Sequence, residues 1–253
     1  MNIHVDKDMF ETLIGSTIGS YQFGSTVYGT TTQDSDVDVL HIFVPSLEHE
    51  MSYVWDNSMF QYKDGNVDHI FTTIDVFIRN LLIGDSTINF EILHGDIGEF
   101  KQLAYLFKNK DMFYNYSIVR AYLGFAKRDL KMAKEGNNKL SHAVRGYYAA
   151  SDIMIGEYGL SFSNELVEFV KDLKGKYDSD LKKSYIGKVE RLRDQLNRKL
   201  DNGEITRYAS PVRLQELDRF VVDLKRSAWY NSFRSEYDLA AIYDRLENGV
   251  KYD

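Results

Sequence analysis

The sequence contains no cysteine and only two prolines among its 253 residues. Without cysteine, a disulfide framework and a thiolate metal site are both excluded, and the composition fits a reducing compartment. Pro45 follows an alternating apolar stretch and ends it as a strand. Pro211 stands at the start of a helical pattern, where the missing N–H of proline costs nothing.

Long apolar runs are also missing. No stretch approaches the ~18 uninterrupted apolar residues that a membrane-spanning helix requires. The first ten residues, MNIHVDKDMF, lack the basic start and the long apolar run of a signal peptide. We therefore expect a soluble, cytoplasmic protein with no membrane partner.

Basic residues are scarce in the first part of the chain. Residues 1–110 hold 16 Asp or Glu against 6 Lys or Arg, whereas the remaining residues hold 22 against 25. An acidic part followed by a mildly basic part indicates two units with different tasks. The acidic part would repel nucleic acid unless metal ions mediate the contact.

The hydrophobic period changes at about residues 105–115. Earlier segments alternate as strands do or form short helices, whereas the segments after Tyr114 repeat with a helical period. We therefore predict an α+β protein: a mixed sheet with flanking helices in a domain of residues 1–110, followed by an all-helical domain of residues 111–253. The expected early elements are a helix at 7–15, a strand ending at Gly24, a strand ended by Pro45, a turn at 64–65, a strand at 67–71, and a helix from Thr72 to Gly84 with Asp75 in a capping box.

Two acids stand on one face of the strand that Pro45 ends. Asp36 and Asp38 are two residues apart, so their side chains project from the same face of a strand. Carboxylates this close repel each other unless a cation lies between them. A solvated turn would explain Asp34 and Ser35 but explains this pair poorly. Oxygen ligands alone favour Mg²⁺ or Mn²⁺, so the pattern predicts a divalent metal site.

A Gly-Ser pair precedes these acids. Gly24 permits close approach of the backbone to an anion, and Ser25 adds a hydroxyl donor. If a helix begins near Ser25, its free N–H groups would point toward the same place. Phosphates and metal would then share one pocket.

Together these residues resemble the signature of the DNA polymerase beta-type nucleotidyltransferase superfamily. Gly24-Ser25, ten intervening residues and Asp36-Val37-Asp38 match its pattern. The longer string GSxxYGxxxxDSDxD over residues 24–38 is similar to the motif of uncharacterised nucleotidyltransferases of bacteria and phages. Two later segments also match that group loosely: residues 85–95 and Lys139-x-x-His142-x-x-Arg145. The resemblance implies transfer of a nucleoside monophosphate from a nucleoside triphosphate to a hydroxyl, with release of pyrophosphate. The acceptor would be an RNA 3′ end, a protein or a small molecule.

The superfamily carries a third carboxylate on a neighbouring strand. Asp68 in the sequence NVDHIFTT is the favoured candidate; Asp64 fits a turn better, and Glu91 in NFEIL fits helix packing. The resemblance implies that Asp36, Asp38 and Asp68 hold two Mg²⁺ (or Mn²⁺) ions, and that Asp68 accepts the proton of the acceptor hydroxyl.

Three basic residues in the helical part complete the candidate site. Lys139, His142 and Arg145 share one helical face, which either turns toward the acidic pocket and binds triphosphate or is an ordinary solvated face. The charged runs KVERLRDQLNRKL and DLKRSAW are expected on the solvent faces of amphipathic helices. The histidines outside this face show no metal-ligand spacing and are expected to be ordinary residues.

Two other functions compete with the nucleotidyltransferase. One is a catalytically silent nucleotide-binding module, an antitoxin-like regulator that acts through a protein partner. The other is a two-metal nuclease, which would use acids at other spacings and has no need of Gly24-Ser25. A silent module has no need to retain acids that repel one another, so Asp36, Asp38 and Asp68 favour an enzyme.

Overall fold

The structure is a computed structural model. It describes residues 17–31, 33, 35–51, 59–98, 100–137, 139–159, 163–173, 179–203 and 211–236. The helix expected at 7–15 and Asp34 lie outside the described residues. None of the helices in the described ranges is long and apolar enough to cross a bilayer.

A four-stranded mixed sheet organises the first half of the chain. Its order is β1-β2-β4-β3, built from β1 (Thr17–Phe23), β2 (Val37–Phe43), β3 (Phe60–Asp64) and β4 (Val67–Thr73). β1 and β3 run antiparallel to their neighbours, whereas β2 and β4 are parallel. The expected turn at 64–65 joins β3 to β4, and Gly65 has the positive φ of 60° that such a turn requires.

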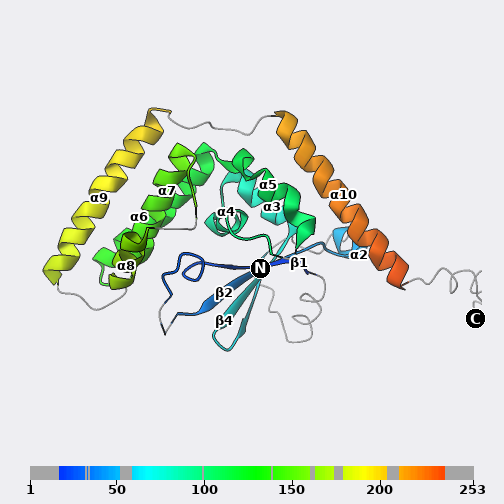
Figure 1. The fold of residues 1–253 in the computed structure, drawn as a ribbon, viewed down its shortest axis with the longest axis horizontal. Helices are drawn as coiled ribbons and strands as arrows, with labels where there is room; N and C mark the ends of the chain where they lie inside the picture. Colours follow the sequence, from blue (N-terminus) through cyan, green and yellow to red (C-terminus); the bar gives the residue numbers. More distant parts are fainter. Residues whose placement is uncertain are drawn as a thin grey trace, which may run out of the picture.

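Helices cover one face of this sheet, as Figure 1 shows. Tyr21, Phe23, Leu40, Ile42 and Ile70 share that face and belong to the hydrophobic core. α3 (Ile74–Ile83) packs against β2 and α4 (Thr87–Leu93) against β1. The α+β fold class predicted from the sequence, a mixed sheet with flanking helices and then a helical region, is confirmed.

The local signals around α3 were close to correct. The helix ends at Gly84 as expected, where a left-handed conformation (φ 66°) closes it. Its start was misplaced by one residue, because β4 continues through Thr73, whose hydroxyl accepts the N–H of Val76 and caps the helix. The expected capping box with Asp75 therefore does not form.

The opposite face of the sheet carries a histidine pair. The Nε2 atom of His41 lies 2.8 Å from Nδ1 of His69, and its Nδ1 atom lies 2.8 Å from the hydroxyl of Ser20. His41 is buried, and burial together with the neighbouring His69 lowers the pKa of His41 to about 4. The ring is therefore held neutral inside the folded protein.

This pair predicts a loss of stability in mild acid. In the unfolded chain His41 takes up a proton near its ordinary pKa of about 6.5, whereas the folded protein resists protonation until about pH 4. The free energy of unfolding should therefore fall as the pH drops from about 6.5 to 4, with His41 contributing about 1–2 kcal/mol of that loss. Urea unfolding at a series of pH values would measure it. His41→Gln should make the curve less steep, and an unchanged slope in that variant would contradict the assignment.

The second half of the chain is helical. Its elements are α5 (Ala104–Lys108), α6 (Tyr116–Lys134), α7 (Leu140–Ile155), α8 (Asn164–Asp172), α9 (Ser179–Asp201) and α10 (Pro211–Glu236), and a short α2 (Leu47–Met51) precedes them after β2. α6 and α7 pack closely because Gly146 has no side chain: a Cβ there would lie 2.9 Å from the Cβ of Ala126. The core is continuous from Tyr21 in β1 to Leu217 in α10. The division into residues 1–110 and 111–253 stays a prediction.

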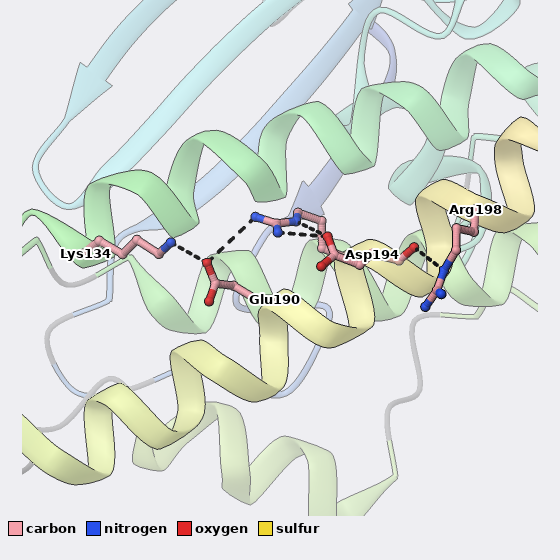
Figure 2. Close-up of polar contacts among 5 residues, drawn as sticks. Lys134, Glu190, Asp194 and Arg198 are labelled. Carbon is pink, nitrogen blue, oxygen red and sulfur yellow. Dashed lines mark hydrogen bonds and ion pairs between the residues drawn. The ribbon is translucent and has the colours of Figure 1, made fainter.

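One ion pair links α9 to α6, and a chain of polar contacts continues from it along α9, as Figure 2 shows. Lys134 of α6 pairs with Glu190 of α9, which also lies 3.9 Å from Arg193. Arg193 in turn lies 2.8 Å from Asp194, whose backbone carbonyl accepts a hydrogen bond from Arg198. Beneath these surface pairs, Val189, Leu196 and Leu200 are buried, so apolar packing supplies most of the attachment.

The last described helix, α10, returns to the first half of the chain (Figure 1). The ammonium of Lys225 lies 2.7 Å from Glu50 of α2 and 2.7 Å from Asp75 of α3. The Trp229 indole donates to the carbonyl of Pro45, and Phe220 stacks on Tyr105. The expectation that DLKRSAW is a solvent face was therefore wrong for Lys225, because the local charge pattern cannot indicate that two distant acids meet this side chain.

Candidate active site

A cleft of about 590 Å³ opens where β1 ends and β2 begins, between that end of the sheet and helices α4, α6 and α7. Clefts of this size commonly hold small-molecule ligands. Seven of the eight site residues predicted from the sequence line it: Gly24, Ser25, Asp36, Asp38, Lys139, His142 and Arg145. The fold thus brings together two segments that are about a hundred residues apart in the chain. Asp68 is not among the residues that line the cleft.

The Gly24-Ser25 segment is a turn that leads out of β1. Gly24 has a φ of 71°, and a Cβ at this position would lie 3.0 Å from Oδ2 of Asp38. Glycine is therefore needed here twice, for its backbone conformation and for the close approach of a carboxylate. The helix considered at Ser25 does not form: residues 24–29 are turns, in which Thr30 donates its N–H to the carbonyl of Ser25.

The three acids meet at the end of the sheet. Parallel pairing of β2 and β4 places Asp38 directly beside Asp68. Only Asp38 lies within β2, which begins at Val37; Asp36 lies just before the strand predicted to carry both acids, and both line the same cleft. Burial, followed by the charges of Asp68 and Asp36, raises the pKa of Asp38. The repulsion expected from the sequence is thus present, and a bound cation would relieve it.

A cation from the protein itself lies at these acids. The Nζ atom of Lys63 on β3 is 3.4 Å from Oδ1 of Asp68 and 3.8 Å from Oδ2 of Asp36. Within the described ranges no group of three or more Asp, Glu or His side chains is arranged to hold a metal ion. The carboxylate oxygens fit a hard divalent cation in their chemistry. A metal held by Asp36 together with Asp68 would have to displace the ammonium of Lys63.

Removing Lys63 is therefore expected to strengthen metal binding. In Lys63→Met the ammonium no longer competes for the two carboxylates, so the dissociation constant for Mn²⁺ or Mg²⁺ should fall roughly fivefold, the scale of one or two exposed ion pairs. Calorimetric titration at pH 7 would measure it. The matched control is Lys183→Met, since Lys183 pairs with Asp180 on α9, away from the cleft. Weaker metal binding in Lys63→Met would mean that the ammonium supports the site.

Glu91 is the acid whose importance the sequence underestimated. It lines the cleft from α4, is 5% exposed, and accepts the N–H of Gly24 at 3.3 Å. Burial raises the pKa of Glu91, whereas Arg145, Gly24 and Tyr28 oppose that rise. The signal in the sequence is an acid within the apolar stretch NFEIL, a setting that also fits helix packing. In the structure Glu91 fixes the turn on which the Gly24-Ser25 pair sits.

A layer of buried tyrosines supports Glu91 and Arg145. The guanidinium of Arg145 lies 4.8 Å from the ring centre of Tyr28, a cation–π contact. The hydroxyl of Tyr28 lies 2.5 Å from that of Tyr158, which is also hydrogen-bonded to the hydroxyl of Tyr122 at 3.0 Å. Tyr158 follows α7 and Tyr122 is on α6, so this layer joins the Gly24 turn to the helical half of the chain.

The three predicted basic residues line the cleft, Lys139 from the residue that precedes α7 and His142 and Arg145 from α7 itself, but their surroundings differ. Arg145 lies over Tyr28, on the side of Glu91 and Asp38. His142 lies instead near α6, with Nδ1 3.6 Å from the buried Asp129 and its ring beside that of Phe125. Arg128, which is not among the site residues predicted from the sequence, also lines the cleft from α6. Its helix carries many Lys and Arg residues, so no local pattern separates it from the solvated ones.

A second hollow of about 500 Å³ lies between α6 and α9. Arg120, Lys127 and Arg193 line it together with Asp194. It contains neither a cluster of acids nor a glycine turn, and Arg193 is already paired with Asp194. We therefore place the candidate active site in the first cleft.

Comparisons with known proteins give distant matches. No family model matches the chain. An uncharacterised 38.9 kDa protein from the nrdC-mobD intergenic region of Enterobacteria phage T4 is 27% identical over 131 residues, which are 44% of this chain and 37% of that protein. The chain thus matches little more than a third of the phage protein's length. The crystal structure of a nucleotidyltransferase-like protein from Exiguobacterium sibiricum matches with a TM-score of 0.35 and 13% identity, over 90% of this chain and 88% of that one.

Proposed function

We propose that the protein is a metal-dependent nucleotidyltransferase, which transfers a nucleoside monophosphate from a nucleoside triphosphate to a hydroxyl and releases pyrophosphate. The observation that carries this proposal is the composition of a single cleft. It combines the Gly24-Ser25 turn, the Asp36 and Asp38 carboxylates, and the cationic Lys139 and Arg145. The carboxylates suit a divalent cation, and the basic side chains with the glycine turn suit phosphates. The two sets of residues together therefore match a metal-bound triphosphate.

The chain's own residues then have distinct tasks. Ser25 would donate its hydroxyl to the β- or γ-phosphate, and Lys139 and Arg145 would neutralise the triphosphate. Asp36, Asp38 and Asp68 would hold Mg²⁺ or Mn²⁺, which when bound supplies neutralisation of the charge on the phosphates. Asp68 would accept the proton of the acceptor hydroxyl as its oxygen bonds to the α-phosphorus and the bond to pyrophosphate breaks. Positioning and charge neutralisation provide most of the rate in such reactions.

The acceptor would be an RNA 3′ end, a protein side chain or a small molecule. The charge balance argues against a long channel for nucleic acid in the first half of the chain, where acids outnumber bases 16 to 6. An RNA end would approach the cleft from the mildly basic helical half.

One observation favours a second candidate, a silent nucleotide-binding module that acts through a protein partner. Lys63 lies between Asp36 and Asp68, so the protein itself relieves part of the repulsion that would otherwise call for a metal. In that case the cleft would bind a triphosphate without transferring it.

A transfer assay separates the two. The protein would be incubated with each α-labelled nucleoside triphosphate, Mg²⁺ or Mn²⁺, and total RNA or cell lysate. We expect label in RNA, in protein or in a small product, together with released pyrophosphate. Thermal stabilisation by triphosphate and Mg²⁺ with no transfer to any acceptor class would favour the silent module and contradict the enzyme.

A further inference from the structure

The α6–α7 side of the cleft presents an aromatic surface with cationic neighbours. The rings of Phe125 and His142 are near parallel, with an interplanar angle of 29° and 6.5 Å between their centroids. The guanidinium of Arg128 lies 5.1 Å from the centre of the Phe125 ring. All three side chains line the cleft, and none of them is fully buried. A planar ligand entering this side would meet π-faces and hydrogen-bond donors together.

A buried carboxylate behind this surface holds it in place. Asp129 is 1% exposed, and its Oδ1 atom accepts a hydrogen bond from Nε of Arg128 at 2.9 Å. Its Oδ2 atom lies 3.6 Å from Nδ1 of His142 and has no hydrogen-bond partner. An acceptor left without a partner in the interior is costly, so packing alone gives no reason for an acid here. A positioning role accounts for the acid: the Asp129 carboxylate contacts both Arg128 and His142, and so orients both side chains toward the cleft.

The surroundings divide the cleft into two sides. The carboxylates of Asp36 and Asp38, and Arg145 over Tyr28, belong to the side formed by the end of the sheet. Phe125, Arg128 and His142 belong to the side formed by α6 and α7. A nucleoside triphosphate has the same division, with a chain of phosphates at one end and a planar base at the other.

We propose that Phe125, Arg128 and His142 form the nucleobase subsite of this cleft, with Asp129 as the positioning residue. This proposal depends on the proposed function in one respect, namely that a nucleoside triphosphate enters the cleft. The proposal therefore reassigns His142, which was predicted from the sequence to bind the triphosphate, to the nucleobase. Lys139 and Arg145 keep their predicted role as triphosphate ligands. Stacking on aromatic side chains accepts any base, because each base has a π-face.

Binding measurements can isolate the base from the phosphates. Inorganic tripolyphosphate carries the phosphates without a base, so its dissociation constant is compared with those of ATP and GTP in Mg²⁺. For the unmodified protein we expect the nucleotides to bind about tenfold more tightly, the scale of one stacked base. Phe125→Leu should remove most of that difference and leave tripolyphosphate binding unchanged, whereas Phe125→Tyr should retain it.

Asp129→Asn tests the positioning role by the same ratio of dissociation constants. We expect it to lower nucleotide affinity several-fold without changing tripolyphosphate affinity, a selectivity that general loosening of the fold would not produce. Lys131→Gln is the matched control, since Lys131 is exposed on α6 and pairs only weakly with Glu135. It should leave both affinities unchanged.

Three results would overturn the proposal. In the unmodified protein, equal affinities for tripolyphosphate and nucleotide would show that the base makes no contact, and this result needs no variant to fold. Equal weakening of both ligands in Phe125→Leu would indicate a structural role. Failure of both ligands to bind would reject the subsite and the proposed function together. Selective base binding without transfer to any acceptor would support the subsite while rejecting the enzyme.

Discussion

Replacing Asp36 and Asp38 together with asparagine is expected to reduce nucleotidyl transfer by roughly three orders of magnitude or more, because the cleft would lose the charges that hold a cation against the triphosphate. The fold should survive. Burial and the neighbouring acids raise the pKa of Asp38, so its ionised form costs stability at neutral pH and a neutral amide removes that cost.

Two measurements on this double variant check both parts of the prediction. Steady-state transfer should disappear, while the thermal unfolding temperature in the absence of metal should equal or exceed that of the unmodified protein. Asp85→Asn, at an exposed acid outside the cleft, should change neither quantity. Full transfer by the double variant would end the metal-dependent proposal, and an unfolded double variant would mean that these acids are structural.

Glu91→Ala is expected to cause the largest loss of stability among the single substitutions in the cleft. The change leaves the buried N–H of Gly24 without its acceptor and removes the negative charge that faces Arg145. Unsatisfied groups of this kind cost about 1–3 kcal/mol each, so the free energy of unfolding should fall by about 3 kcal/mol. Urea denaturation would measure it.

Glu91→Gln separates the hydrogen bond from the charge. The amide oxygen of glutamine can still accept the hydrogen bond from the N–H of Gly24. The variant also avoids the free-energy cost of burying an ionised carboxylate. Because the pKa of Glu91 is raised in the folded protein, its favourable contribution is greatest at low pH and declines as the pH rises through that pKa. The glutamine variant should therefore stay within about 1 kcal/mol of the unmodified protein at pH 7. A loss as large as that of alanine would assign the role to the charge instead.

The sequence predicted the parts of the cleft that depend on local spacing. The two-residue spacing of Asp36 and Asp38 indicates that these acids lie close together, although only Asp38 is within β2, and Gly24 indicates the turn that the structure shows. The α+β class followed in the same way from a change of hydrophobic period. These inferences needed no knowledge of which segments meet in space.

The side chains whose roles could not be predicted from the sequence are those that depend on tertiary contacts. Lys63 reaches Asp36 and Asp68 only because β3 pairs beside β4 at the edge of the sheet. Asp129 looks like one more charge on a basic helix until packing against α7 buries it. Sheet order and helix packing depend on the whole chain, so neither residue carries a local signature.

The return of α10 to α2 and α3 has a practical consequence for dissecting the molecule. Lys225 and Trp229 contact side chains and backbone that belong to the first half of the chain, and Leu217 is part of the same core. A fragment containing residues 1–110 alone would leave Glu50 and Asp75 without their shared counter-ion and would bare the apolar surface beneath the helices. Separate expression of the two halves should therefore yield insoluble material, whereas co-expression as complementary fragments should reconstitute the cleft.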